Sequence, residues 1–466
     1  MNTDSRQRPY LFYGQTQSLC EQCLVLVPAK IVFMDECVFY LKRCPQHGSQ
    51  KTLVSTDIPY FLKCKEYLKP GDIPHQFQTR IERGCPYDCG LCPDHEQHSC
   101  LAIFDIIDEC NMRCPICYAD SAPHRGNPKS MQQIQAMLNT LLASEITPDL
   151  VQVSGGEPTL HPEILDILSL IHRSEVRHLM LNTNGIRIAR EPAFADQLAK
   201  FNQGFEVYLQ FDSLKADALR ALRGIDARRT REDALKHLEQ RGISTTLVCT
   251  VQKGVNDHEI DDLIAYALKW RCVRGITFQP IQRAGRTENF AKPDRFTLSD
   301  IRTQIASGSN AFSDDDLLPL PCHPENICIG YALRNSEEPQ QLAPISGLIS
   351  RETLLSGTGN TITFETSSEL KDAFLDTFSL DALSPDVAER LQTLLCCLPR
   401  VEAPDLSYEN VFRVVIMSFL DAHDFCISSV KRSCVHFVTP QGKIYPFDTY
   451  NLFYRDRVEL PGVSSS

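Results

Sequence analysis

The chain has 466 residues, which exceeds the roughly 100–200 residues of one ordinary domain, so we expect two or three structural units. Hydrophobic residues make up 42% and charged residues 23%, which are the proportions of a globular protein and exclude a disordered or fibrous chain. The 47 Lys and Arg residues against 59 Asp and Glu residues give a net charge of −12, which argues against broad binding to nucleic acid or to an anionic membrane.

The N-terminus and the apolar runs predict a soluble, cytoplasmic protein. Residues 1–6 begin no apolar segment of the kind that a secretory signal needs. The run from Leu24 to Met34 is interrupted by Pro28 and Lys30, and it is shorter than the roughly 18 residues of a membrane span. We therefore expect no transmembrane segment.

Cysteine is unusually frequent in this chain. There are 20 cysteines, and twelve of them fall within the first 117 residues. A cytosolic chain keeps its thiols reduced, so clustered cysteines predict metal ligands. A disulfide framework is the alternative, but such frameworks are typical of short secreted chains.

The first cysteine set predicts a small metal-binding module within residues 1–84. Two ligands on one CxxC turn, followed by others about twenty residues later, can complete a tetrahedral site for a mononuclear zinc or iron ion. We expect short strands at Ile31–Met34 and Val38–Leu41 between them, an arrangement that resembles a zinc ribbon or rubredoxin module. The predicted ligands are Cys20, Cys23, Cys44 and His47, with Cys37 and Cys64 as competitors for the fourth position.

The second set occupies residues 85–100 and predicts an auxiliary iron–sulfur cluster. Glycine and proline residues separate its cysteines, as is typical of a tight loop around a cluster with four thiolate ligands. Zinc is the alternative metal, and His95 or His98 could replace one thiolate. The predicted ligands are Cys85, Cys89, Cys92 and Cys100.

The third set follows a predicted buried strand at Leu101–Ile107. Its members Cys110, Cys114 and Cys117 have the spacing C-x3-C-x2-C. Three thiolates can bind three irons of a cubane cluster and leave the fourth iron without a protein ligand. An open metal position can bind a small molecule, and loops after parallel strands are where α/β barrels place their active sites.

This motif resembles the signature of the radical S-adenosylmethionine (SAM) superfamily. In that family the open iron of a [4Fe–4S] cluster chelates SAM, and an electron from the reduced cluster cleaves SAM to methionine and a 5′-deoxyadenosyl radical. That radical abstracts hydrogen from the substrate. The resemblance implies catalytic roles for Cys110, Cys114 and Cys117. It also implies a SAM cofactor and an electron donor such as flavodoxin or ferredoxin.

The alternation of elements predicts an α/β fold for residues 101–290. Ser130 can cap a helix at Met131–Ala143, and Ile164–Ile171 has the apolar spacing of a second helix. Strands that alternate with helices build a parallel sheet, here a partial parallel (β/α)6 barrel. The six predicted strands are Leu101–Ile107, Leu150–Ser154, Arg177–Asn182, Phe205–Phe211, Ile243–Val251 and Gly275–Pro280.

Polar residues at the ends of these strands are candidates for SAM binding. The sequence Gly-Gly-Glu-Pro at 155–158 resembles the family's GGEP motif, which contacts the SAM amino group. Glycines allow close approach of the backbone, and a carboxylate can pair with an ammonium group. For the other positions, a polar residue that simply ends a strand is the alternative. The predicted SAM-binding residues are Gly155, Gly156, Glu157, Pro158, Asn182, Gln210, Asp212 and Arg286.

Residues 291–466 predict an α+β region with a further auxiliary cluster. Cys322, Cys328 and Cys434 are its candidate ligands, and residues 436–438 and 443–446 flank a turn at 440–442 that predicts a hairpin. With the segments 84–100 and 110–119, this region resembles the tetraether-lipid synthase group, once called class D radical SAM methyltransferases. That group has a cysteine where this chain has Asp448, and a carboxylate is a weaker partner for cluster iron than a thiolate.

Three functions are compatible with these motifs. The first is radical functionalisation of an unactivated sp3 carbon, with C–C bond formation on a lipid alkyl chain and peripheral contact with a membrane. The second is methylation of a pterin-like small molecule, and the third is a non-catalytic metal-binding scaffold. A lipid needs an apolar channel, whereas a pterin needs polar groups at the barrel mouth. Four phenylalanines could line such a channel, but the sequence favours core positions for them. They are Phe374, Phe378, Phe412 and Phe419.

Overall fold

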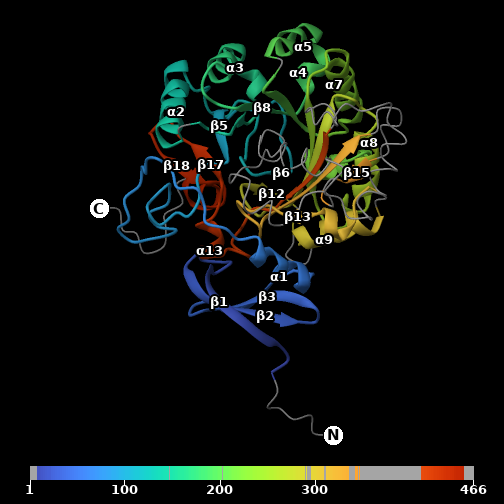
Figure 1. The fold of residues 1–466 in the computed structure, drawn as a ribbon. Coiled ribbons are helices and arrows are strands. Elements are labelled where there is room, and N and C mark those ends of the chain that lie inside the picture. Colours follow the sequence, from blue (N-terminus) through green and yellow to red (C-terminus); the bar gives the residue numbers. More distant parts are fainter. Residues whose placement is uncertain are drawn as a thin grey trace, which may run out of the picture.

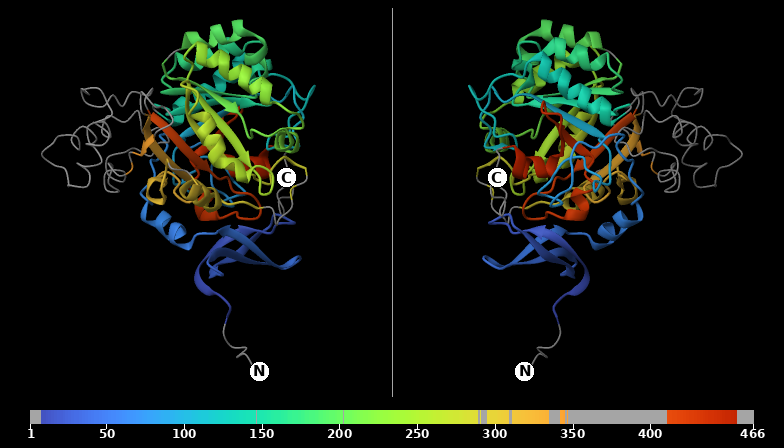
Figure 2. Two further views of the ribbon diagram at one scale, coloured as in Figure 1. Left: turned by 90° about the vertical axis from the view of Figure 1, so that its right-hand side faces the viewer. Right: turned by 90° about the vertical axis from the view of Figure 1, so that its left-hand side faces the viewer.

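The protein is described here by a computed structural model, which consists of an N-terminal sheet below a larger α/β body (Figure 1). The residues that the structure describes are 8–145, 147–201, 203–288, 290, 295–308, 311–334, 342–344, 346 and 411–455. The side views in Figure 2 place the N-terminal sheet at one end of the molecule and helices of the α/β body at the other. Phe374 and Phe378 lie outside the described residues.

The N-terminal sheet is an antiparallel meander of four strands. They are β1 (Leu11–Leu19), β2 (Leu26–Met34), β3 (Cys37–Cys44) and β4 (Gly48–Ser55), paired in that order. The sequence predicts only the C-terminal part of β2 and the N-terminal part of β3, because β1 and β4 contain runs of polar residues. Helix α1 (Ile58–Glu66) follows, and the Asp57 side chain caps it by accepting a hydrogen bond from the Tyr60 amide.

The six predicted barrel strands are all present, and they pair in chain order in parallel. Every residue of the first strand is buried, as expected of a strand covered on both faces. The six strands are β5 (Leu101–Ile107), β7 (Leu150–Gly155), β8 (His178–Thr183), β9 (Phe205–Gln210), β10 (Thr245–Val251) and β11 (Val273–Pro280).

Helices between these strands cover one face of the sheet. The first of them shows why they form, because the Ser130 side chain accepts a hydrogen bond from the Gln133 amide and Gln133 reciprocates. Its residues Ile134, Leu138 and Leu141 are buried at helical spacing. These helices are α2 (Met131–Ser144), α3 (Ile164–His172), α4 (Ile186–Arg190), α5 (Pro192–Leu198), α6 (Ala216–Arg223), α7 (Arg228–Gln240) and α8 (Ile260–Ala267).

The C-terminal strands extend the same sheet at both edges. Strand β16 (Val411–Met417) pairs in parallel with β11, and β17 (Val435–Val438) pairs in parallel with β5. The predicted hairpin is confirmed, since β18 (Ile444–Pro446) is antiparallel to β17. The remaining elements are β6 (Ile116–Cys117), β12 (Arg286–Thr287), α9 (Leu298–Gly308), β13 (Leu318–Pro319), β14 (Ile327–Arg334), β15 (Leu342–Pro344), α13 (Ile427–Val430), α14 (Phe447–Thr449) and a π-helical turn at Tyr450–Tyr454.

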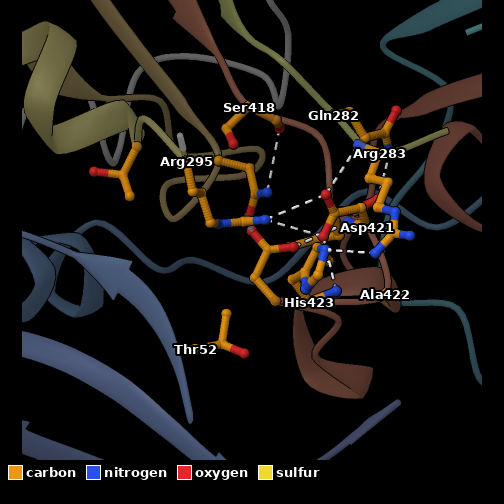
Figure 3. Close-up of polar contacts among 12 residues, drawn as sticks. Thr52, Gln282, Arg283, Arg295, Ser418, Asp421, Ala422 and His423 are labelled. Carbon is orange, nitrogen blue, oxygen red and sulfur yellow. Dashed lines mark hydrogen bonds and ion pairs between the residues drawn. The ribbon is translucent and has the colours of Figure 1, made fainter. Parts of the chain in front are cut away.

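A buried polar network joins the N-terminal sheet to the α/β body. Asp421, on the loop after β16, accepts hydrogen bonds from the Arg295 guanidinium at 3.0 and 3.2 Å and from the Arg283 amide at 2.9 Å (Figure 3). His423 lies 3.2 Å from Glu21 of the N-terminal sheet. Burial raises the pKa of Asp421, but Arg295 and His423 outweigh it, so the pKa is lowered and the carboxylate stays ionised.

Among the described residues, no helix is both long enough and apolar enough to cross a bilayer.

The Asp421–Arg295 pair yields a test of stability. Asp421→Asn should lower the free energy of unfolding by about 3 kcal/mol at pH 7, because it leaves a buried guanidinium with one carboxylate fewer. Asp217→Asn is the matched control, since its pair with Arg220 is exposed and should contribute under about 1 kcal/mol. Anaerobic urea denaturation of each variant and of the wild type measures both free-energy differences.

The effect should also depend on pH. The native pKa of Asp421 is depressed, so its stabilisation is present above the ordinary carboxyl pKa of about 4 and is lost as the pH falls through the native pKa. The difference between the wild type and Asp421→Asn should therefore shrink below about pH 4. An equal loss of unfolding free energy in Asp421→Asn and in Asp217→Asn would contradict this role of the Asp421–Arg295 pair.

Candidate active site and metal centres

The loop that follows β5 carries the C-x3-C-x2-C motif and forms one wall of a cavity. We call residues 108–118 the cysteine loop. Its Cys110, Cys114 and Cys117 line an open cavity with about 1040 Å³ of empty space, part of which is open to solvent. The other walls come from the carboxyl ends of the strands, where an α/β barrel places its active site. They include Gly155, Gly156, Glu157, Asn182, Asn184, Gln210, Gln279, Gln282, Phe419 and Phe447.

Two arginines fix the path of the cysteine loop. The Arg223 guanidinium donates to the Ile116 carbonyl at 3.1 Å and to both carboxylate oxygens of Asp212 at 2.6 and 2.8 Å. The Arg286 guanidinium donates to the Cys114 carbonyl at 2.6 Å and to the Ser121 carbonyl at 2.7 Å. Strand β12 also pairs with β6 within the loop. The loop is therefore held in place by groups from two distant segments, helix α6 and strand β12.

The two glycines at the end of β7 are required by the backbone of this loop. A Cβ atom on Gly155, whose φ is +129°, would lie 2.2 Å from the Ile107 carbonyl oxygen, and one on Gly156 would lie 2.2 Å from the Glu109 carbonyl oxygen. The Gly156 and Glu157 amides donate to these carbonyls at 2.7 and 2.9 Å. We expected these glycines to admit a ligand, and the structure adds that they admit the start of the cysteine loop.

Glu157 is fixed at the floor of the cavity. Its side chain is buried and accepts hydrogen bonds from the Thr159 and Thr183 hydroxyls at 2.6 and 2.7 Å and from the Asn184 amide at 2.8 Å. Burial raises the pKa of Glu157 despite these donors. A buried carboxylate beside Cys110 suits the predicted contact with an ammonium group, which would restore the ionised form.

The other predicted SAM-binding residues divide into two groups. Asn182 and Gln210 line the cavity, where the Asn182 amide donates to the Ser154 hydroxyl at 3.0 Å and the Gln210 amide to Asp212 at 2.7 Å. Asp212 and Arg286 are not among the lining residues. Asp212 is fully buried between Arg223 and Arg231, and Arg286 is committed to the cysteine loop. Asp212 therefore positions the two arginines, and Arg286 positions the cysteine loop. Pro158 begins a short helical turn and is not among the lining residues.

The cysteine loop fits an iron–sulfur cluster in its chemistry. Burial and the nearby Glu157 carboxylate raise the pKa of Cys110 to about 12, and burial raises the pKa of Cys114 although Arg223 opposes it. These groups would be neutral thiols in the absence of metal, and bound cations are what stabilise them as thiolates. Three cysteines that line one open cavity match a [4Fe–4S] cluster with one iron exposed to a small ligand.

The second cysteine set differs from its predicted membership. Cys89 lies with its sulfur 2.8 Å from the Thr449 hydroxyl, and Cys85 and Cys92 are near it. Cys100 is elsewhere, because its sulfur lies within 4.8 Å of those of Cys322 and Cys434. The pairing of β17 with β5 causes this, since it brings the residues before the two strands together.

Two C-terminal expectations also change. Cys328, predicted as a cluster ligand, lies on β14 in the main core beside Tyr60 and Cys64. Asp448 is buried and accepts a hydrogen bond from the Leu420 amide at 2.6 Å, while burial raises its pKa to about 7. The Asp448 carboxyl group therefore accepts the hydrogen bond of a backbone amide. It is not part of the group formed by Cys100, Cys322 and Cys434.

The predicted N-terminal ligands come together as one set. We call Cys20, Cys23, Cys44 and His47 the N-terminal knuckle, and their ligand atoms all lie within 4.8 Å of one another. The sulfurs of Cys23 and Cys44 are 3.8 Å apart, and His47 Nδ1 is 3.5 Å from both Cys20 and Cys44. Cys37 and Cys64, the competitors for the fourth position, are not in this set. The donor set suits a tetrahedral ion.

Several residues of the cavity escaped sequence reasoning. Arg223 lies on α6 and gives no local signal, because an arginine at the end of a helix is ordinary. Asn184 and Gln282 follow strand ends, a position that could have flagged them. Phe419 and Phe447 belong to the C-terminal region, and Phe419 was judged a core residue. Only the pairing of β16 and β17 with the barrel strands brings these rings to the cavity.

Comparisons with known proteins agree with this geometry. The model of the radical SAM superfamily matches residues 104–267, and a model named "HMPTM N-terminal zinc ribbon domain" matches residues 12–56. The chain is 28% identical to 7,8-dihydro-6-hydroxymethylpterin dimethyltransferase of Methanocaldococcus jannaschii, over 96% of this chain and 94% of that protein. It is 30% identical to the GTP 3′,8-cyclase of Acaryochloris marina over 43% of this chain, which spans 62% of the cyclase.

Among solved structures, SuiB of Streptococcus suis bound to SAM matches with a TM-score of 0.39 and 16% identity, over 46% of this chain and 49% of that one. The superfamily match begins within β5 and includes the cysteine loop, the GGEP turn and the ends of β8 to β10. The chain therefore carries a radical SAM superfamily domain behind an N-terminal zinc ribbon, and it is a radical SAM enzyme.

Proposed function

We propose that this enzyme methylates a carbon of a pterin-like heterocycle, with one SAM molecule cleaved to the radical that removes hydrogen and a second SAM molecule, with one further electron from the reductant, supplying the methyl group. The proposal goes beyond the radical SAM domain and rests first on the aromatic wall of the cavity, which meets the cysteine loop where Phe447 contacts Tyr118 at 5.3 Å between ring centroids. There the rings of Phe419 and Phe447 are stacked, with centroids 3.9 Å apart, and Phe437 continues the stack at 5.2 Å from Phe447. A flat heteroaromatic ring is a natural partner for such a surface.

The polar part of the lining supports the same substrate class. Five amide side chains border the cavity, and amides can both donate to and accept from the edge of a pterin. Its two arginines, Arg223 and Arg231, are already paired with Asp212. The lining amides are Asn182, Asn184, Gln210, Gln279 and Gln282. The relative from Methanocaldococcus jannaschii, which is named a pterin dimethyltransferase, aligns over nearly the whole chain and adds support.

Coupling of lipid alkyl chains, our first expectation, finds less support in this cavity. An alkyl chain needs a long apolar channel, because unpaired polar groups beside it would lose hydrogen bonds to water. Five amide side chains border this cavity, and Phe412 lies fully buried in the core of the sheet rather than along the cavity. A non-catalytic scaffold is replaced by the enzyme assignment.

The roles of the chain's own residues follow from their positions. A [4Fe–4S] cluster on Cys110, Cys114 and Cys117, reduced by a donor such as flavodoxin or ferredoxin, would supply the electron that cleaves SAM and so provides a hydrogen-abstracting radical. Glu157 would receive the SAM ammonium group, and Asn182 and Gln210 would orient the remainder of SAM. The stacked phenylalanines would orient the heterocycle toward the cysteine loop. Closure of these walls would keep water from the reacting carbon.

The substrate class is tested by product analysis. Reconstituted enzyme is incubated anaerobically with SAM, dithionite and 7,8-dihydro-6-hydroxymethylpterin, and in a parallel reaction with a dialkylglycerol lipid. We expect 5′-deoxyadenosine to form with the pterin, together with a pterin product heavier by one or two methylene units. A coupled lipid product with an unchanged pterin would instead restore the lipid function.

Cys114→Ala should abolish 5′-deoxyadenosine formation, because the loop then has two thiolates for a cluster that needs three. Chromatography of the reaction with SAM and dithionite measures this. Cys272→Ala is the control, since Cys272 is a buried cysteine that precedes β11 at the opposite end of the sheet, and this variant should keep its activity. Deoxyadenosine formation by Cys114→Ala would remove the cysteine loop from the reaction.

Phe419→Leu should raise the KM for the pterin by up to about tenfold, because a stacked pair contributes about 0.5–1.5 kcal/mol beyond burial. The slow cleavage of SAM without substrate should stay unchanged, since Phe419 is not expected to touch the cluster. Phe412→Leu, the same change in the core of β16, controls for stability and should leave the KM unaltered. An equal KM for both variants and the wild type would argue against stacking on Phe419.

A further inference from the structure

We propose that Cys100, Cys322 and Cys434 bind a mononuclear metal ion, for which zinc is the best fit, with His98 as the fourth ligand. The three sulfurs come from segments more than 100 residues apart, yet all three side chains are buried, at 0–1% exposure, and point at one another. The proposal concerns a different part of the fold from the cavity and does not depend on the substrate.

The spacing of the sulfurs separates a single ion from a cluster. Four tetrahedral bonds of about 2.3 Å place zinc-bound sulfurs about 3.8 Å apart. The sulfurs of Cys322 and Cys434 are 3.6 Å apart, and all three sulfurs lie within 4.8 Å of one another. A cubane holds its thiolates on separate irons and so spreads them further.

The same chain provides an internal comparison. The N-terminal knuckle, in the segment matched by the zinc ribbon model, has its Cys23 and Cys44 sulfurs 3.8 Å apart. Within the part of the chain that the structure describes, this knuckle and the Cys100 set are the two groups whose ligand atoms all lie within 4.8 Å. Cys110, Cys114 and Cys117 do not meet that limit, as expected for ligands of a larger cluster. The Cys100 set therefore has the spacing of the zinc ribbon.

His98 is the candidate for the fourth donor. Its ring nitrogens do not lie within 4.8 Å of all three sulfurs, so the ring would move toward them when the ion binds. Its Nε2 atom lies 3.5 Å from the Cys100 sulfur, and its Nδ1 atom lies 3.1 Å from a Glu145 carboxylate oxygen. A carboxylate on the second ring nitrogen is the usual support of a metal-bound histidine, because it fixes the tautomer that leaves the other nitrogen free to bind. The second Glu145 oxygen accepts from the Ser99 amide at 2.8 Å, so this support is itself anchored.

The position of the site indicates a structural role. Cys100 and Cys434 immediately precede the paired strands β5 and β17, and Cys322 lies on the turn that leads into β14. The seven residues of β5 separate the site from the cysteine loop by about 20 Å. A closed, buried ion at this end of the sheet would link the first barrel strand to the C-terminal region, whose residues complete the cavity at the other end.

Metal and sulfide counts test the proposal on the full-length enzyme, purified anaerobically. Cys322→Ala should lose one metal ion per chain by mass spectrometry while its acid-labile sulfide stays at the wild-type level. The matched control is Cys328→Ala, a buried cysteine six residues away on β14, which should lose neither. Loss of several irons together with sulfide would overturn the proposal in favour of a cluster. Unchanged metal in Cys322→Ala would overturn it in favour of unligated thiols or a disulfide.

A second measurement covers the case in which Cys322→Ala does not fold. Cys44→Ala removes a ligand of the N-terminal knuckle and leaves the Cys100 set intact. We expect this variant to retain one zinc ion per chain, whose X-ray absorption fits three sulfur ligands and one nitrogen ligand. Absence of that ion, or an environment with only nitrogen and oxygen, would count against the site. His98→Ala should retain the sulfurs and lose the nitrogen contribution.

Discussion

The architecture of the active site depends on how the cysteine loop is anchored through its backbone carbonyls. Arg223 and Arg286 donate to the Ile116 and Cys114 carbonyls, so the path of the loop is held through its backbone. The Cys110 sulfur also accepts the Met112 amide at 3.4 Å, a contact that a sulfur bound to a cluster can keep. That leaves the three sulfurs available to iron. Asp212 keeps Arg223 in place, and Arg231 shares the same carboxylate, so a buried charge that would be costly alone is compensated on two sides. The conformation of the cysteine loop therefore depends on residues of the surrounding barrel.

Sheet pairing also determines which metal sites can exist. Strand β17 is separated from β5 by more than 300 residues, yet the two pair in register, with Val435 opposite Leu101. That register places Cys434 next to Cys100. Cys100 is therefore grouped with Cys434 and not with Cys85, its predicted partner in the second cysteine set. Strand β16 on the opposite edge brings Phe419 to the cavity by the same principle. Strands β16 and β17 of the predicted C-terminal α+β region are therefore continuous with the barrel sheet.

The sequence predicts the local parts of this structure well. All six barrel strands, the Ser130 cap, the C-terminal hairpin and the four ligands of the N-terminal knuckle follow from patterns within about thirty residues. Polar strands such as β1 and β4 escape prediction because their apolar alternation is weak. The groupings of Cys100 and Cys328 escape for another reason. They depend on contacts between distant segments, and neither spacing nor composition contains the register of a parallel pair.

The division between the six barrel strands and the strands added at the edges explains how one enzyme can keep a common radical chemistry and a particular substrate. The residues that bind SAM are proposed to lie on short-range motifs, at the ends of β5, β7, β8 and β9. The rings that would select the heterocycle lie at 419 and 447, after strands added at the edges. A change at Phe419 can therefore alter this wall of the cavity directly, whereas Phe447 also packs against Tyr118 of the cysteine loop. The buried Asp448 lies one residue from Phe447, and its carboxyl accepts the Leu420 amide next to Phe419. It joins the backbones that carry both rings, which gives this residue a positioning role in place of metal binding.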